Sequence, residues 1–253
     1  MIIPILKGGL GNQLFQIANA YAFAKRHKFD FGINYNLSFS GGQGNLAHNY
    51  RNNLYAKIPF TDMSLQVSYI EPTFSYIEIP AMDNILLDGY FQTEKYFEDF
   101  ENDIKNLFVF PDEVKSKVDQ FFNGLNHPVV GIHIRRGDYV RLSNFHKVQK
   151  SDYYANASKE LGQCQAIVCT DDWNTVQKEM KFTNAIRSPF TNEIEDLYLL
   201  SQCDSLIICN SSFSWWGAYL GKKKDKVIAP KQWFAEQGPQ DYQDIYRKDW
   251  IRI

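Results

Sequence analysis

Hydrophobic residues in the second half of the chain alternate between short apolar runs and segments with helical spacing. The apolar runs predict strands at 128–134, 165–170, 205–209 and 226–229. The segments between them predict helices near 152–161, 173–180, 192–202 and 213–221. Strands that alternate with helices in this way are typical of a parallel sheet covered by helices and joined by right-handed crossovers. The second half is therefore predicted to be an α/β domain.

The first half begins with the same pattern and then loses it. We predict a strand at 2–6, a glycine turn, a helix from about 12 to 26, strands at 31–33 and 85–90, and helices over 96–107 and 111–122. Residues 36–80 are rich in Asn, Ser, Gly, Tyr and Pro, and we assign no elements to them. A long irregular segment in a compact domain is often a functional surface. A merely irregular surface loop is the alternative.

The segment 123–128 carries the Asn, Gly and Pro residues that mark a boundary between domains. We therefore predict two domains, over residues 1–126 and 127–253. With 253 residues, of which 44% are hydrophobic and 15% aromatic, the chain can bury one large core or two modest ones. Its formal net charge of −2 gives no general attraction to nucleic acid or to an anionic membrane, so any affinity for phosphate has to be local.

The N-terminal apolar run lacks a basic leader and a small-residue cleavage site, and it is interpreted as a strand rather than a signal peptide. No run approaches the roughly 20 apolar residues that cross a bilayer. We therefore expect a soluble, cytoplasmic protein. Cys169 and Cys209 end apolar runs, and we expect all four cysteines to be reduced, mostly as core residues, rather than disulfide-bonded or bound to zinc.

Polar side chains follow three of the strands predicted in the second half. They comprise Arg135–Asp138, Asp171–Asp172 and Ser211–Ser212. Because the carboxyl ends of parallel strands meet at one edge of a sheet, these groups are expected to converge on one crevice. Arginine suits an anion site, since its planar fork bonds phosphate oxygens in pairs and stays charged when desolvated. The alternative is an ordinary solvated turn with a local salt bridge.

The serines stand where a helix begins, so their hydroxyls and the backbone N–H groups of the first turn could hold a phosphate, or the serines could simply cap the helix. Asp171 or Asp172 could accept hydrogen bonds from a nucleotide, although at least one of them is expected to cap the helix at Trp173. The pair Trp215–Trp216 favours core packing over stacking on a ligand.

The glycine turn at residues 8–11 offers a second candidate site. Glycine lets a backbone approach a ligand closely, so Gly9 is a candidate contact, and Asn12 and Gln13 carry amides for sugar hydroxyls or phosphate. The alternative is a tight strand-to-helix turn with Asn12 as the N-cap. Elsewhere the sequence contains no Asp-x-Asp, no phosphate-binding P-loop and no Gly-x-Ser-x-Gly, so a metal-bound diphosphate, an NTPase and an α/β-hydrolase are not indicated.

Four blocks together resemble the α-1,2-fucosyltransferases, the glycosyltransferase family 11, in its short bacterial form. They are GGLGNQLFQ at 8–16, HIRRGDY at 133–139, TDDW at 170–173 and NSSFSWWG at 210–217. The resemblance implies a GT-B architecture, with two Rossmann-like domains facing across a cleft. Residues 127–253 would bind GDP-fucose, and residues 1–126 would mostly contact the acceptor.

The resemblance also implies the reaction: inverting, metal-independent transfer of L-fucose from GDP-β-L-fucose to the 2-hydroxyl of a terminal galactose, with no cofactor. It implies that Arg135 contacts the β-phosphate, that His133 approaches the nucleotide, that Asp204 recognises guanine, and that Ser211, Ser212 and Phe213 lie at the diphosphate and fucose. Asp138 is the candidate general base; pairing with Arg136 or closing the turn is the alternative.

The predicted site thus has Arg135 and Asp138 as catalytic residues and no metal ligands. The predicted substrate-binding residues are Gly9, Asn12, Gln13, His133, Arg136, Asp171, Asp172, Asp204, Ser211, Ser212 and Phe213. The expected partners are GDP-fucose and a β-galactoside or lipid-linked glycan, with no nucleic acid and at most peripheral association with the inner face of the membrane. The alternatives are transfer of another GDP-sugar, or a non-catalytic module that binds a nucleotide or glycan.

Overall fold

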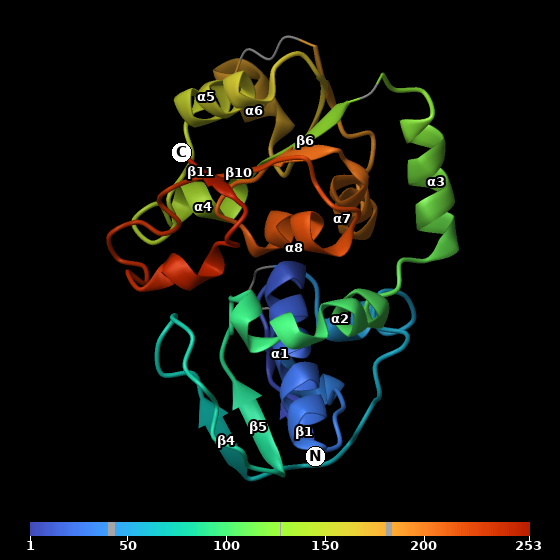
Figure 1. Ribbon diagram of the computed structural model, residues 1–253, viewed down its shortest axis with the longest axis vertical. Helices are drawn as coiled ribbons and strands as arrows, with labels where there is room; N and C mark the ends of the chain where they lie inside the picture. The colour runs from blue at the N-terminus through green and yellow to red at the C-terminus, as the bar shows by residue number, and fades with distance from the viewer. Residues whose placement is uncertain (40–43, 127, 181–183) are drawn as a thin grey trace. The chain divides into compact units, whose positions relative to one another are not determined.

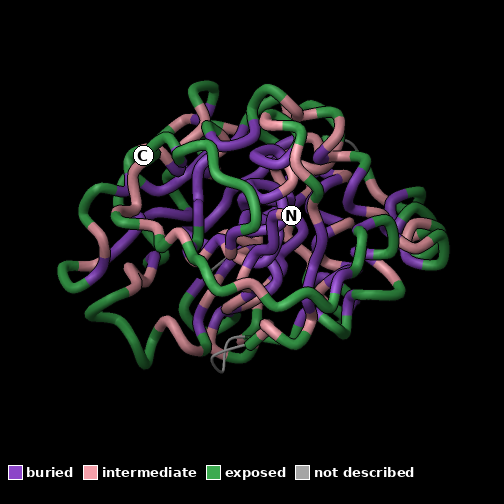
Figure 2. The backbone as a smooth tube through the Cα atoms, turned by 90° about the horizontal axis from the view of Figure 1, so that it is seen from below, coloured by how far each residue is buried: buried purple, intermediate pink, exposed green. Residues whose placement is uncertain are grey.

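The computed structural model of the chain describes residues 1–39, 44–126, 128–180 and 184–253 (Figure 1). The chain divides into two compact units. Unit 1 comprises Met1–Pro111 and Asp241–Arg247, and unit 2 comprises Asp112–Gln240 and Lys248–Ile253. Figure 2 shows the burial of each residue: buried residues form long stretches of the chain, and many of the exposed residues lie in loops.

Unit 1 contains short parallel strands and one long helix. Its elements are β1 (Ile2–Pro4), β2 (Leu6–Lys7), α1 (Leu10–His27), η1 (Tyr35–Leu37), β3 (Ser38–Phe39), η2 (Ala47–Tyr50), β4 (Val67–Ile70), β5 (Ile85–Asp88), η3 (Glu94–Tyr96), η4 (Glu98–Phe100), α2 (Glu101–Leu107) and η5 (Tyr242–Ile245). One sheet has the order β1-β5-β4, and β2 pairs with β3. All these pairings are parallel.

The glycine turn before α1 follows from local geometry. Gly8 has φ +77°, a left-handed conformation that favours glycine, and a Cβ at this position would lie 2.4 Å from Nδ2 of Asn12. Gly9 is the N-cap, so α1 begins at Leu10, before the predicted start. The predicted strand at 31–33 is present only as isolated parallel bridges, from Ile2 to Phe31 and from Ile33 to Phe60.

The described residues of unit 2 form a six-stranded sheet with helices on both faces (Figure 1). Its elements are α3 (Asp112–Phe122), β6 (Val129–Ile134), α4 (Gly137–Arg141), α5 (Ser151–Leu161), β7 (Gln165–Thr170), α6 (Trp173–Glu179), β8 (Ala185–Arg187), α7 (Glu193–Gln202), β9 (Ser205–Ile207), α8 (Ser212–Leu220), β10 (Val227–Ala229) and β11 (Ile251–Arg252). The strand order is β11-β10-β9-β6-β7-β8, and every neighbouring pair is parallel. The predicted alternation of strands and helices is confirmed; β8 and β11 are additional strands.

The central strand β6 is buried along its whole length, and its two faces contact different helices. Val130, Ile132 and Ile134 pack in one cluster with Tyr153 and Tyr154 of α5. On the other face, a Cβ at Gly131 would come within 2.9 Å of Leu200 in α7, so the strand and this helix approach too closely for a side chain. Figure 1 shows α5 and α6 on one side of the sheet and α7 and α8 on the other. As predicted, Trp215 and Trp216 of α8 are fully buried.

The division between the units falls between Pro111 and Asp112, before the predicted boundary at 126/127. The reason is that α3 packs on unit 2. Lys117 forms an ion pair with Glu195 at 2.6 Å, the Tyr198 hydroxyl donates to Asp119 at 3.3 Å, and Phe121 packs its ring against a phenylalanine beyond β8. The predicted boundary segment is therefore a connection inside unit 2.

A second departure from the predicted boundary is that the segment 241–247 joins unit 1. The Asp241 carboxylate accepts hydrogen bonds from the N–H groups of Phe74 at 2.9 Å and Ser75 at 3.2 Å, and from the hydroxyl of Thr73. Asp244 accepts from the N–H of Tyr76 at 3.0 Å and pairs with a lysine of η3. Two carboxylates thus hold one otherwise irregular strip of unit 1.

Residues 36–80 contain β3, η2, β4 and part of η1, while residues 40–43 lie outside the described part of the chain. The edge strand β4 escaped prediction because its residues do not alternate: Val67, Ser68 and Ile70 are all exposed. All four cysteines are free, and Cys169, Cys203 and Cys209 are buried as predicted. Among the described residues, no helix has the length and apolarity needed to cross a membrane.

Candidate active site

The turns after β6 and β7 meet at the carboxyl edge of the unit 2 sheet through Arg135. Its Nε donates to Oδ1 of Asp138 at 2.9 Å and lies 3.2 Å from Oδ2 of Asp171, and its side chain keeps 33% of its exposure. Burial alone would lower the pKa of Arg135, but the two carboxylates outweigh it and the pKa is raised. The edge therefore presents a permanently charged, oriented and partly accessible guanidinium group.

Asp171 also fixes the backbone of the arginine turn. Its Oδ1 accepts a hydrogen bond from the N–H of Arg136 at 2.8 Å. A Cβ at Gly137 would lie 2.6 Å from Oδ2 of Asp171, so a glycine is needed for this close approach. The prediction that Asp171 lies beside the arginine turn agrees with its position, and the contacts show that it acts on the turn itself.

The third turn, after β9, is joined to the same edge by Tyr139. The Tyr139 hydroxyl donates to the carbonyl oxygen of Asn210 at 2.9 Å, and it also bonds Ser211. Ser211 is the N-cap residue of α8, but among the described residues its side chain makes no capping hydrogen bond to the helix. The first turn of α8, with Ser212 and Phe213, therefore directs backbone N–H groups toward this edge.

His133 lies near the end of β6 beneath this surface. Its Nδ1 is 3.2 Å from Sγ of Cys209, and its ring centroid is 5.3 Å from that of Phe213. Burial, assisted by the charge of Arg135, lowers the pKa of His133 to about 3. His133 is thus a neutral imidazole at physiological pH. The structure places His133, Arg135, Asp138, Asp171 and the turn at 211–213 together, as predicted.

The prediction for Arg136 is corrected. Its side chain is almost fully buried, and its guanidinium donates to the carbonyl oxygen of Gln149 and to the Glu179 carboxylate, each at 2.8 Å. Arg136 is the N-cap residue of α4, with φ −124° and ψ −83°, and its side chain contacts Gln149 and Glu179 rather than the two carboxylates that hold Arg135. Arg136 ties this turn to α6, and Arg135 alone is presented.

The prediction for Asp204 is corrected as well. Asp204 immediately precedes β9, and its Oδ2 accepts from the N–H of Val129, the first residue of β6, at 2.7 Å. Its Oδ1 pairs with Lys222 at 2.6 Å. In a parallel sheet the amino ends of all strands lie on one side and the carboxyl ends on the other. Asp204 therefore lies at the amino ends of the strands, whereas Arg135 lies at their carboxyl ends.

Asp172 performs the capping role that the sequence left open. It is the N-cap of α6, and its carboxylate accepts from the N–H of Thr175 at 3.1 Å and from the Thr175 hydroxyl at 2.6 Å. These two hydrogen bonds lower the pKa of Asp172. Its prediction as a substrate contact loses support, because the carboxylate is directed to its own helix.

The side-chain amides of Asn12 and Gln13, after the glycine turn of unit 1, form hydrogen bonds within unit 1. Gln13 is completely buried; its Nε2 donates to the carbonyl oxygens of Gly8 and Asn45, and its Oε1 accepts from the Tyr55 hydroxyl. This corrects its prediction as a substrate contact. Asn12 lies inside α1 rather than at the N-cap, and its Oδ1 accepts from Gln92 at 2.7 Å. Gly9 is partly exposed, so it stays a candidate contact.

A carboxylate that the sequence analysis missed lies at the same edge of unit 2. Asp196, in the first turn of α7, accepts on Oδ1 from the Ser188 hydroxyl at 2.5 Å and lies 3.7 Å from Sγ of Cys169. Those two residues stand at the carboxyl ends of β8 and β7. Burial raises the pKa of Asp196 to about 6. An acid in a first helical turn is commonplace, so the sequence carried no signal that this one is buried.

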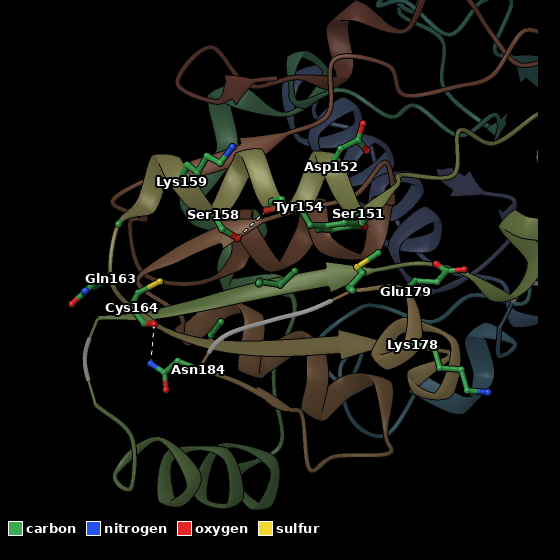
Figure 3. Close-up of a pocket in the computed structure, with 15 residues that line it drawn as sticks. Ser151, Asp152, Tyr154, Ser158, Lys159, Gln163, Cys164, Lys178, Glu179 and Asn184 are labelled. Atoms are coloured by element: carbon green, nitrogen blue, oxygen red, sulfur yellow. Dashed lines mark hydrogen bonds between the residues drawn. The ribbon is translucent and has the colours of Figure 1, made fainter.

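A pocket of about 1080 Å³ opens elsewhere in unit 2, beside α5 (Figure 3). Ile132 and Ala166 are among the residues that line it. Ser151 and Lys159 of α5 lie along one side. Within the described part of the chain it is lined by no predicted site residue, although it includes Glu179, the partner of Arg136. We assign this pocket no ligand. The residues described also contain no His, Cys, Asp and Glu cluster suited to a metal ion.

Two solved fucosyltransferase structures have the same fold as this chain. NodZ from Bradyrhizobium superposes with a TM-score of 0.58 at 14% identity, covering 87% of this chain and 92% of that chain. POFUT1 in complex with GDP gives a TM-score of 0.55 at 12% identity, covering 90% and 97%. The α/β fold with parallel sheets is therefore that of the GT-B glycosyltransferases, as predicted.

The sequence comparison is more specific than the fold. The profile of Glycosyl transferase family 11 matches residues 65–253, and the chain belongs to this family, the α-1,2-fucosyltransferase family predicted from its sequence blocks. It is 28% identical to the O-antigen biosynthesis glycosyltransferase WbnK of Escherichia coli, over 91% of this chain and 94% of that protein. It is 27% identical to an alpha-1,2-colitosyltransferase of the same species, over 100% and 99%. A galactoside 2-alpha-L-fucosyltransferase of Caenorhabditis elegans is 25% identical, over 90% and 71%.

Proposed function

We propose that this glycosyltransferase moves L-fucose from GDP-β-L-fucose to the 2-hydroxyl of a terminal galactose, with inversion at the transferred carbon. The observation that carries the proposal is the position of Arg135, which Asp138 and Asp171 hold at the carboxyl edge of the unit 2 sheet. Family membership, and relatives named as galactoside 2-fucosyltransferases, support the sugar and the linkage.

Charge development explains how this edge would act. As the bond between fucose and the diphosphate breaks, negative charge grows on the departing GDP while the sugar becomes oxocarbenium-like. A fixed guanidinium stabilises that charge as it forms, because it needs no reorganisation at the moment of reaction. The N–H groups of the first turn of α8 are suited to the same diphosphate. In this proposal the arginine and the helix terminus supply the counter-charge, without a metal.

We assign recognition of the guanine base to Asp196 in place of Asp204. Guanine presents N–H donors that a carboxylate can accept, and Asp196 is a partly buried acid at the same edge as Arg135. The neutral ring of His133 lies beneath the nucleotide site in this proposal, and it does not compete with Arg135 for charge.

Asp138 is better suited to orient Arg135 than to serve as general base. Its Oδ1 accepts from Nε of Arg135 at 2.9 Å and lies 2.8 Å from a second guanidinium nitrogen, so it fixes both the position and the plane of the group. The structural alternative foreseen for Asp138 therefore gains support, with Arg135 rather than Arg136 as its partner.

A second donor is a specific alternative, because a relative that aligns with the whole chain is named an alpha-1,2-colitosyltransferase. Colitose and fucose donors would present the same GDP to unit 2 and would differ only in the sugar. For the acceptor, the O-antigen relative favours a β-galactoside within a surface glycan or its lipid-linked precursor. An enzyme acting on such a precursor would work at the inner face of the membrane.

The test is incubation of the purified chain with GDP-fucose, GDP-colitose or GDP-mannose and a panel of β-galactosides, each with and without EDTA. We expect a fucosylated product with an α-1,2 linkage, unchanged by EDTA, and little product from GDP-mannose. Preference for GDP-colitose would replace the donor assignment. Binding of GDP without any product would identify a non-catalytic module and overturn the proposal.

A further inference from the structure

The carboxyl edge of the unit 1 sheets carries a cluster of a different chemical character. Lys7 ends β2 and Asp88 ends β5, and their side chains form an ion pair at 2.6 Å. The two side chains keep 21% and 30% of their exposure, so both are accessible. Tyr90, two residues beyond β5, is 36% exposed, and Nζ of Lys7 lies 5.1 Å from the centre of its ring. We call Lys7, Asp88 and Tyr90 the unit 1 edge cluster.

The loop that presents Tyr90 is held in an unfavourable conformation by one carboxylate. Glu71 accepts from the N–H of Tyr90 on Oε2 at 2.6 Å and from the N–H of Phe91 on Oε1 at 3.0 Å. Phe91 has φ +50°, which is a genuine outlier for a bulky residue. A Cβ at Gly89 would lie 2.4 Å from Cβ of Glu71, so only glycine allows this approach.

The backbone of Lys7, on the other side of the cluster, is also held by hydrogen bonds. The buried side chain of Gln16 bonds both backbone groups of Lys7: its Oε1 accepts from the Lys7 N–H at 2.9 Å, and its Nε2 donates to the Lys7 carbonyl at 3.1 Å. Gln92, just beyond the Tyr90 loop, donates to Asn12 of α1 at 2.7 Å. The lysine and the tyrosine are therefore held on two backbones whose positions are set from within unit 1.

The chemistry of the cluster suits an uncharged, polyhydroxylated ring. Lys7 and Asp88 offset each other's charge, so the cluster lacks the excess cation that would retain a phosphate or diphosphate. Sugar hydroxyls both donate and accept, and a paired carboxylate and ammonium offer both partners. An aromatic ring with an exposed face can pack on the C–H face of a pyranose, as aromatic groups do at many binding surfaces.

Resting on the proposed function, we infer that the unit 1 edge cluster is the subsite for the terminal sugar of the acceptor, with Glu71 as the residue that positions it. Tyr90 packs on the sugar ring, Asp88 and Lys7 bond its hydroxyls, and the Glu71 carboxylate holds the 89–91 loop that carries Tyr90. Ligands of open α/β sheets bind at the carboxyl ends of the strands, and this cluster occupies that position in unit 1.

The experiment measures acceptor and donor kinetics separately in four variants. At saturating GDP-fucose, Tyr90→Ala is expected to raise the acceptor KM about tenfold, as loss of a well-packed aromatic contact does. Tyr90→Phe keeps the ring and is expected to stay within about twofold of the parent. Glu71→Gln cannot accept both N–H groups, so it is expected to raise the acceptor KM while leaving the donor KM and the GDP dissociation constant unchanged. Tyr21→Ala, at a tyrosine near the far end of α1, is the matched control for loss of an aromatic side chain.

Each outcome separates this inference from the proposed function. A parent enzyme that forms no product from any β-galactoside contradicts the proposed function, and the cluster then loses its basis too. A parent that is active, with Tyr90→Ala folded by circular dichroism and unchanged in acceptor KM, overturns the inference alone. Equal changes in donor and acceptor KM in Glu71→Gln would show a general structural role and would also overturn it.

Discussion

The carboxyl edges of the sheets in the two units are equivalent in topology and opposite in chemistry. In unit 2 the edge presents Arg135 between two carboxylates, beside the first turn of α8. In unit 1 it presents a lysine–aspartate ion pair, whose charges offset each other, and a tyrosine ring. The first arrangement suits an anion whose charge grows during reaction, and the second suits a neutral sugar.

This difference indicates that the topology of a parallel sheet determines the position of a site, whereas the residues just after each strand determine which ligand it suits. Both edges are built by the same means, a carboxylate that binds the backbone of a neighbouring turn. Asp171 accepts from the Arg136 N–H in unit 2, and Glu71 accepts from two N–H groups of the Tyr90 loop in unit 1. In each case a glycine, Gly137 or Gly89, makes room for that carboxylate.

Replacing the charged group of unit 2 should produce the largest effect. We expect Arg135→Lys to fold normally and to lower kcat by about a hundredfold or more, because a point charge cannot reproduce a fork held by two carboxylates. The acceptor KM should change little. Arg141→Lys, on the exposed end of α4, is the control. Steady-state kinetics on both substrates test this, and a near-normal kcat in the Arg135 variant would remove that residue from the mechanism.

A change of pH is expected to have a smaller effect, and this effect should be on the donor KM and not on the acceptor KM. Because burial raises the pKa of Asp196 to about 6, its carboxylate forms only as the pH rises through that value. If the carboxylate accepts guanine N–H groups, the donor KM should increase as the pH falls below about 6. His133 cannot cause this dependence, since its pKa is lowered to about 3.

The variant Asp196→Asn sharpens the pH test. Its donor KM should be raised about tenfold and should no longer vary between pH 5 and 7. Stability provides an independent test. A carboxyl group whose pKa is raised in the folded state binds its proton more tightly there than in the unfolded state. Its contribution to the free energy of unfolding therefore falls as the pH rises from about 4 to about 6. Thermal unfolding across that range should show the fall in the parent and not in the variant. A donor KM that is flat with pH in the parent contradicts the assignment.

The smallest kinetic effect is expected at Asp204. Because its carboxylate binds the Val129 N–H at the opposite edge of the sheet, Asp204→Ala should cost about 1–3 kcal/mol of stability and leave the GDP dissociation constant unchanged. Urea unfolding and calorimetric titration with GDP measure the two quantities. A marked loss of GDP affinity in the folded variant would restore Asp204 as the guanine contact.

The alternation of strands and helices in unit 2 could be predicted because its strands are buried on both faces and appear as continuous apolar runs. The convergence of the three turns followed from that topology. The choice between Arg135 and Arg136 could not be predicted. It depends on the backbone of the turn, where Arg136 has φ −124° and ψ −83°, outside the regular conformations.

The prediction for Asp204 came from the family resemblance and not from the topology. Asp204 immediately precedes the strand predicted at 205–209, which places it at the amino ends of the strands, whereas Asp196 lies in the first turn of α7. In unit 1, the strands are only two to four residues long and β4 is exposed. Their apolar pattern is therefore too short to predict strands from the sequence. Phe91, in a conformation that its residue type disfavours, could only be found in the structure.

The path of the last residues has a consequence for any shortened form of the enzyme. Residues 241–247 supply the two carboxylates that bind the 73–76 strip of unit 1, and residues 251–252 supply β11 at the edge of the unit 2 sheet. Neither unit is encoded by one continuous stretch of sequence. A truncation after Gln240 would therefore strip the backbone partners from one unit and an edge strand from the other, and neither half could be expressed intact as a simple fragment.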